Sequence, residues 1–134
     1  GGPPLTTPRR KVRLKRVYDA PAPNDGYRIL VDRLWPRGLS KPAARIDLWM
    51  KDAAPSTQLR RWYHTDLSRW PEFRARYRAE LADPENPALA ALRAIVREHT
   101  KRGGQGVTLL YGAADVEQNH AIVLRDLLHR RDSR

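Results

Sequence analysis

Three short segments of the chain have the hydrophobic pattern of β-strands. Residues 12–18 alternate apolar and basic positions with a period near two, which predicts a strand that is covered on one face. Residues 27–34 and 106–112 are apolar on both faces, as expected for the central strands of a parallel sheet. Pro36 and Gly38 mark the end of the second strand.

Apolar residues at helical spacing predict helices in the rest of the chain. Residues 39–54 are expected to hold a loop and a short helix, which carries Ile46, Leu48, Trp49 and Met50. Ser56 is a predicted N-cap for the next helix. Further helices are expected around Trp70 to Leu81, over residues 88–103, and after the turn at 113–120.

Strands that are separated by helices predict an α/β protein. We expect a small three-layer fold, in which helices pack on both faces of a short parallel sheet of about three strands. A length of 134 residues suits one domain, which we place at residues 12–130. Residues 1–11, which are rich in proline and basic side chains, are predicted to be a disordered lead-in.

The net charge of +11 is concentrated near the chain ends. Residues 9–16 carry six basic side chains, whereas residues 17–128 are close to balanced, with 17 basic and 14 acidic side chains. A basic arm of this kind can bind nucleic acid through its phosphates. It can equally be a solvated tail, which is the interpretation we favour, so nucleic acid is the less expected partner.

The absence of cysteine excludes disulfides, thiolate metal sites and a cysteine nucleophile. No apolar stretch approaches the roughly 20 residues that cross a bilayer, and no signal peptide is visible. The sequence therefore predicts a cytoplasmic protein that is not membrane-bound. We expect no metal and no cofactor, and the oligomeric state stays open.

The stretch L-V-D-R-L-W-P-R-G, residues 30–38, places charged side chains at the end of a buried strand. Ligands of parallel α/β sheets bind outside the carboxyl ends of the strands. In one interpretation Arg33 or Arg37 holds a carboxylate or phosphate, and Asp32 orients the arginine. In the other, an internal Asp–Arg pair fastens the strand to the next loop. Trp35 can stack on a flat ligand or on an arginine.

The second informative stretch, L-L-Y-G-A-A-D-V-E-Q-N-H-A, follows the third strand. Tyr111 and Gly112 end the strand, and small residues then allow backbone N–H groups to approach an anion. Asn119 and His120 begin the last helix. His120 can act as a general acid or base, but the residues alone favour a structural histidine that bonds a neighbouring carbonyl.

Together these motifs resemble the bacterial family called domain of unknown function 488 (DUF 488), and within it the YeaO-like branch that lacks cysteines. The resemblance rests on V-Y-D-A-P-A-P-N-D-G-Y-R-I-L-V-D-R-L-W-P-R-G, W-M-K-D-A-A-P-S, L-R-R-W-Y-H, F-R-A-R-Y-R-A-E-L and L-L-Y-G-A-A-D-V-E-Q-N-H-A-I-V-L, in that order. It implies a bacterial cytoplasmic α/β protein of one domain, in a family without an established activity.

Another branch of that family carries V-D-V-R at residues 31–34, and cysteines at the positions of Tyr111 and Asn119. Only the Asp and the His of that branch are carried over, at Asp32 and His120, so the resemblance implies a polar pocket without a thiol. Our first hypothesis is a small-anion site that includes these residues and the arginines. If chemistry occurs there, His120 is the proton carrier. The alternatives are a nucleic-acid-associated or regulatory protein that uses the basic arm, and a non-catalytic protein-interaction module.

Overall fold

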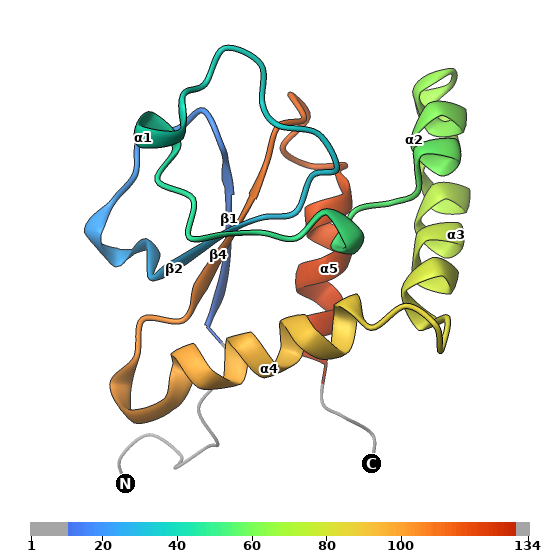
Figure 1. The fold of residues 1–134 in the computed structure, drawn as a ribbon. Helices are drawn as coiled ribbons and strands as arrows, with labels where there is room; N and C mark the ends of the chain where they lie inside the picture. The colour runs from blue at the N-terminus through green and yellow to red at the C-terminus, as the bar shows by residue number, and fades with distance from the viewer. Residues whose placement is uncertain (1–10, 131–134) are drawn as a thin grey trace, which may run out of the picture.

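A parallel sheet of four strands forms the centre of the fold (Figure 1). The structure is a computed structural model, and it describes residues 11–130. The strands are β1 (Val12–Arg16), β2 (Tyr27–Leu30), β3 (Leu48–Trp49) and β4 (Val107–Tyr111), in the spatial order β1-β4-β2-β3. All three pairings are parallel, which confirms the predicted α/β class and adds a fourth strand.

The central strands are apolar on both faces, as their sequence predicts. Ile29 and Leu109 are paired and contribute to a large hydrophobic cluster on one face. Leu30 and Leu110, the next pair along, belong to a smaller cluster on the other face. All four side chains are fully buried, so β2 and β4 hold the two layers of the core together.

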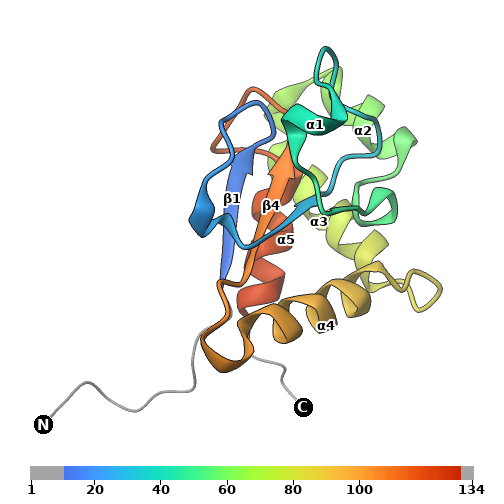
Figure 2. The ribbon, with the colours of Figure 1, turned by 60° about the vertical axis from the view of Figure 1, so that its left-hand side comes forward.

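The long helices contribute to the large cluster. They are α2 (Thr57–His64), α3 (Trp70–Ala82), α4 (Ala88–Thr100) and α5 (His120–His129). Helix α5 contacts β1 and β4, and α4 contacts β4. In Figure 2, α5 lies behind these two strands and α4 crosses beneath them. The remaining helical segments are short: η1 (Pro23–Asp25), α1 (Lys41–Ala44), η2 (Lys51–Ala53), η3 (Leu67–Arg69) and η4 (Lys101–Gly103).

The second face of the sheet is covered mainly by a segment with little regular structure, whereas the three-layer prediction expects a layer of helices there. Its cluster is completed by half-buried side chains from the segment that contains α1 and β3: Trp35, Leu39, Ile46 and Trp49. The short helix that the sequence predicts around Leu48 and Trp49 lies earlier in the chain, at Lys41–Ala44. Leu48 and Trp49 form the strand β3, in which they pair with Ile29 and Leu30. A strand of two residues is too short to show a hydrophobic period, so the sequence could not reveal it.

Several predicted boundaries are close to the observed ones. Ser56 caps α2, since its hydroxyl accepts a hydrogen bond of 3.1 Å from the Leu59 N–H. The second strand is four residues shorter than residues 27–34, although Val31 beyond it is fully buried. The lead-in predicted at residues 1–11 lies outside the described residues except for Lys11, and the one-domain assignment stays a prediction. No helix within residues 11–130 combines the length and apolar character needed to cross a bilayer.

A buried ionic cluster lies near the amino end of β2, where the Asp25 carboxylate pairs with Arg28 and Lys15. The Asp25 carboxylate lies 2.6 Å from Arg28 Nη1 and 2.8 Å from Lys15 Nζ, and Asp25 and Arg28 are each 4% exposed. Thr108 donates to the Asp25 carbonyl at 2.6 Å. Burial raises the pKa of Asp25, but hydrogen bonds from Lys15, the Ala22 N–H and Arg28 outweigh it, so the pKa is lowered overall. The cluster therefore anchors β1, β2 and β4 at the end opposite to the predicted site.

Candidate functional site

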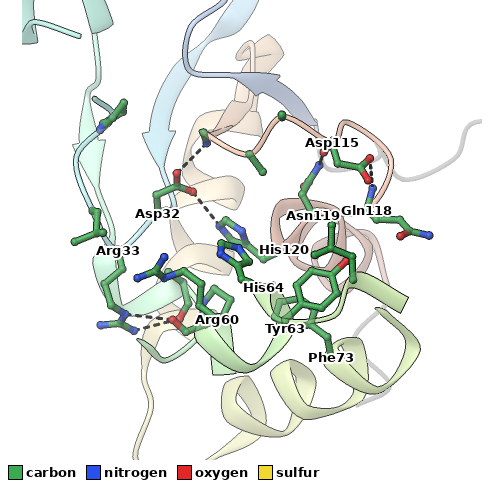
Figure 3. A pocket seen from close by; sticks show the side chains of 18 of the residues that line it. Asp32, Arg33, Arg60, Tyr63, His64, Phe73, Asp115, Gln118, Asn119 and His120 are labelled. Atoms are coloured by element: carbon green, nitrogen blue, oxygen red, sulfur yellow. Dashed lines mark hydrogen bonds and ion pairs between the residues drawn. The ribbon is translucent and has the colours of Figure 1, made fainter. Parts of the chain in front are cut away.

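A cavity of about 650 Å³ lies at the carboxyl ends of the strands (Figure 3). Its walls come from residues that follow the strands, from α2 and from the start of α5. Most of the predicted site residues line this cavity: Asp32, Arg33, Trp35, Arg37, Gly112, Asn119 and His120. The parallel sheet thus brings together segments that are about 80 residues apart in sequence, as the strand-end argument predicts.

Asp32 joins the two loops that form the cavity. Its Oδ2 accepts a hydrogen bond of 2.8 Å from the Gly112 N–H, and its backbone carbonyl accepts one of 2.7 Å from Trp49 Nε1. Its Oδ1 is buried, lies 3.1 Å from His120 Nε2, and receives no well-directed hydrogen bond. A Cβ at position 112 would lie only 3.0 Å from Asp32 Oδ2, so glycine permits this close approach.

The proton position on His120 follows from its neighbours. Nε2 lies 2.8 Å from the Val31 carbonyl, and a carbonyl oxygen can only accept a hydrogen bond. Nε2 therefore carries the proton, which it donates to Val31 while facing the Asp32 carboxylate. The ring also packs edge-on against Tyr77, with 6.1 Å between the ring centroids. His120 therefore has the carbonyl bond that the structural interpretation expects, and Nδ1 is the ring nitrogen that this bond leaves without a proton.

Arg33 is fixed by backbone carbonyls. Its Nε donates to Pro55 at 3.2 Å and its Nη2 donates to Ala54 at 3.3 Å. Within residues 11–130 no ion pair joins Asp32 to Arg33, so the internal pair of the second interpretation does not form between these two residues. The two carbonyl bonds use Nε and Nη2, so Nη1 of Arg33 remains able to donate a hydrogen bond to a ligand.

The other predicted residues have different environments. Trp35 Nε1 donates to the Leu39 carbonyl at 2.6 Å, and its ring meets Trp49 edge-on, so it serves the second hydrophobic cluster as well as the cavity wall. Arg37 is exposed at the rim. Asn119 caps α5 by accepting from the Ile122 N–H at 3.1 Å, and its Nδ2 donates to the Asp115 carbonyl at 2.8 Å.

Tyr111 is the predicted site residue that does not line the cavity. It is 3% exposed and belongs to the large core cluster. Burial raises its pKa above the ordinary value, although nearby Arg16 and a side-chain hydrogen bond with Asn119 partly offset this effect.

Helix α2 contributes residues that the sequence analysis did not assign to the site. Arg60, Tyr63 and His64 recur at helical spacing and line the cavity, whereas Arg61 points elsewhere and is exposed. Phe73 from α3 stacks on Tyr63, with ring centroids 4.4 Å apart. Burial, aided by the nearby Asp115 carboxylate, raises the pKa of Tyr63.

The Arg60 side chain lacks a hydrogen-bond acceptor for its buried Nε–H group within residues 11–130. No carboxylate in the described part of the chain forms an ion pair with it. Among the described residues, no group of three histidine or acidic side chains is arranged to hold a metal ion.

Comparison with known proteins places the chain among bacterial relatives. It is 44% identical over 121 residues to the uncharacterized protein Rv3073c of Mycobacterium tuberculosis, which covers 90% of this chain and 96% of that protein. It is 45% identical over 117 residues to the uncharacterized protein YeaO of Escherichia coli, which covers 87% of this chain and 96% of that protein. No solved structure matches the chain at a significant level.

The family comparison agrees with these relatives and with the resemblance seen in the sequence motifs. The model of the family described as "Inactive DUF488-N3 subclade" matches residues 11–134, a range that includes every residue the structure describes. The chain therefore belongs to the DUF488 family, in the subclade described as inactive.

Proposed function

We propose that the cavity binds a small anionic ligand through a phosphate or carboxylate group. The observation that carries this proposal is the Arg60 side chain, whose buried Nε has no acceptor. A buried N–H group that loses water without gaining an acceptor is destabilising, and the Nε–H of Arg60 is such a group. An anion in the cavity supplies the missing acceptor and offsets that cost.

The charges around the cavity support the same conclusion. The lining residues include three arginines, Arg33, Arg37 and Arg60, against two carboxylates. Both carboxylates are engaged by backbone N–H groups: Asp32 by Gly112, and Asp115 by Glu117 and Gln118. Their charges are therefore partly compensated by the fold, and the arginines remain to attract an anion.

Binding without catalysis fits the side chains better than a reaction does. The chain has no cysteine, and His120 Nε2 donates to the Val31 carbonyl, so neither a thiol nor that nitrogen serves as a nucleophile. The subclade to which the chain belongs is described as inactive. Proton transfer through His120 Nδ1 remains the alternative, and it predicts turnover of a bound anion that is lost in His120→Gln.

The nucleic-acid alternative receives less support from the described part of the basic arm. Arg13 donates to the carbonyls of Asp25 and Gln105, and Lys15 pairs with the Asp25 carboxylate. Arg16 donates to the Ala113 carbonyl at 2.9 Å. These three cations have intramolecular acceptors, so they are less available for phosphates than their sequence suggests. Arg9 and Arg10 lie outside the described residues.

The proposal is tested by titrating inorganic phosphate into the protein at constant ionic strength, with isothermal calorimetry as the readout. Arg60→Gln removes the unpaired charge and keeps most of the side-chain length. Arg61→Gln is the matched control, since Arg61 is on the same helix but does not line the cavity. We expect R60Q to weaken phosphate binding about tenfold, in line with the loss of a charged hydrogen bond, and R61Q to leave it unchanged. Equal affinities for R60Q and the parent protein contradict the proposal.

A further inference from the structure

Exposed apolar side chains gather at the mouth of the cavity. Within residues 11–130 the large apolar side chains that are exposed to solvent are Tyr18, Leu34, Leu67 and Val116. Three of them, all except Val116, line the cavity. These three come from three separate segments, after β1, after β2 and in η3, so no single loop accounts for their position.

The exposure of these leucines is large. Leu34 is 63% exposed and Leu67 is 57% exposed, although the hydrophobic clusters bury most other leucines of the domain. Apolar surface in contact with water is unfavourable, and an exposed apolar group beside a concave polar site is typical of a ligand or partner surface. The mouth of the cavity therefore offers apolar area that an inorganic anion alone cannot use.

The interior of the cavity is also divided into a cationic and an aromatic part. In Figure 3, Arg33 and Arg60 lie on one side, whereas Tyr63 and Phe73 lie on another. Arg60 and Tyr63 are three positions apart on α2, and side chains at this spacing are neighbours, about 5–6 Å apart at Cβ. The cationic and the aromatic part of the wall therefore come from adjacent positions of one helix.

The volume of the cavity also favours a ligand larger than an inorganic anion. A cavity of about 650 Å³ is much larger than a phosphate ion and falls in the range of about 300–1,000 Å³ that accommodates organic ligands. An inorganic anion held by Arg60 would leave the Tyr63 and Leu67 side of this space to water. A ligand with a ring would fill it.

We propose that the ligand is an aryl anion, in which a phosphate or carboxylate is attached to a flat apolar ring. This inference rests on the proposed function, because it assigns the anionic end to Arg60. The ring contacts the small part of Tyr63 and Phe73 that faces the cavity, since these side chains are 7% and 3% exposed, and it reaches the leucines at the mouth. Contact with these aromatic side chains and the burial of apolar area at the mouth then add to the charge interaction.

The test compares two probes, inorganic phosphate and phenyl phosphate, by calorimetry at constant ionic strength. We expect phenyl phosphate to bind at least tenfold more tightly than inorganic phosphate. Leu67→Ser removes apolar area at an exposed position, so we expect the protein to fold normally. It is expected to weaken phenyl phosphate about threefold or more and to leave inorganic phosphate unchanged.

Val116→Ser is the matched control, because Val116 is 59% exposed but does not line the cavity. We expect it to change neither affinity. Equal affinity of the two probes for the parent protein overturns the aryl inference, and so does a loss of phenyl phosphate binding in V116S as large as in L67S.

Arg60→Gln separates this inference from the proposal on which it rests. If R60Q weakens inorganic phosphate while phenyl phosphate has no advantage, the anion site stands and the aryl inference fails. If neither probe binds the parent protein, or if R60Q weakens neither, the anion site itself fails. The expected result is a loss of affinity for both probes in R60Q and for phenyl phosphate alone in L67S.

Discussion

Replacement of Asp32 by asparagine removes the charge that holds the two cavity loops together. In the native protein Oδ2 accepts from the Gly112 N–H at 2.8 Å, and Oδ1 faces the protonated Nε2 of His120 at 3.1 Å. An asparagine has one acceptor and one donor group in place of two acceptors. Either orientation of the amide therefore directs an NH₂ group at an N–H group.

If the amide oxygen keeps Gly112, the NH₂ group faces His120 Nε2–H, which the Val31 carbonyl holds in place at 2.8 Å. If the amide is reversed, the Gly112 N–H loses its acceptor. A buried donor left without an acceptor costs about 1–3 kcal/mol, so we expect D32N to lower the free energy of unfolding by about 2 kcal/mol. For a domain of this size that loss corresponds to a fall in Tm of several degrees.

The assay is urea denaturation followed by tryptophan fluorescence, with the free energy of unfolding taken from the linear extrapolation. Asp52→Asn is the control, because Asp52 is exposed and does not line the cavity, and we expect it to stay within about 0.5 kcal/mol of the parent protein. A D32N variant as stable as D52N would refute the reasoning, since Asp32 would then be a carboxylate at the surface with no role in joining the loops.

Two further predictions concern stability outside the cavity. Ser56→Ala removes the cap of α2 and the hydrogen bond of 2.6 Å from the Ser56 hydroxyl to Glu80 on α3, so we expect a loss of about 1–2 kcal/mol, measured by the same urea assay. Asp25→Asn leaves the buried Arg28 without its carboxylate and is expected to cost about 3 kcal/mol at neutral pH. Because the pKa of Asp25 is lowered in the folded protein, its contribution is fully present above the ordinary value near 4 and is lost as the pH falls through the lowered folded value. The stability difference between D25N and the parent protein should therefore shrink in acid, and a difference that grows in acid contradicts the assignment.

The strands and long helices could be predicted because their signal is local. Ile29, Leu30 and Val31 are fully buried on alternating faces, as their sequence indicates, and Ser56 caps its helix with the hydroxyl that the pattern identified. The strand formed by Leu48 and Trp49 could not be predicted, because its formation depends on pairing with β2, a contact distant in sequence. The same holds for the buried cluster of Asp25 and Arg28, since nothing local indicates that both side chains lose their contact with water.

The location of the cavity and the wall residues that follow the strands could be predicted from the rule for parallel sheets, but the wall that α2 contributes could not. Arg60 and Arg61 are identical in type and adjacent, and only the orientation of α2 directs the first into the cavity and the second to solvent. The position of Tyr111 at the end of β4 predicts a site residue, yet its side chain belongs to the face that the helices cover. Alternation along β4 does distinguish these faces, once it is known which of them the helices occupy.

The most direct test of the anion site is the phosphate titration of the parent protein, Arg60→Gln and Arg61→Gln. The account predicts measurable binding to the parent protein and to R61Q, and about tenfold weaker binding to R60Q. Absence of phosphate binding to the parent protein, or equal affinity in R60Q and R61Q, would contradict the assignment of Arg60 as the anion-binding side chain.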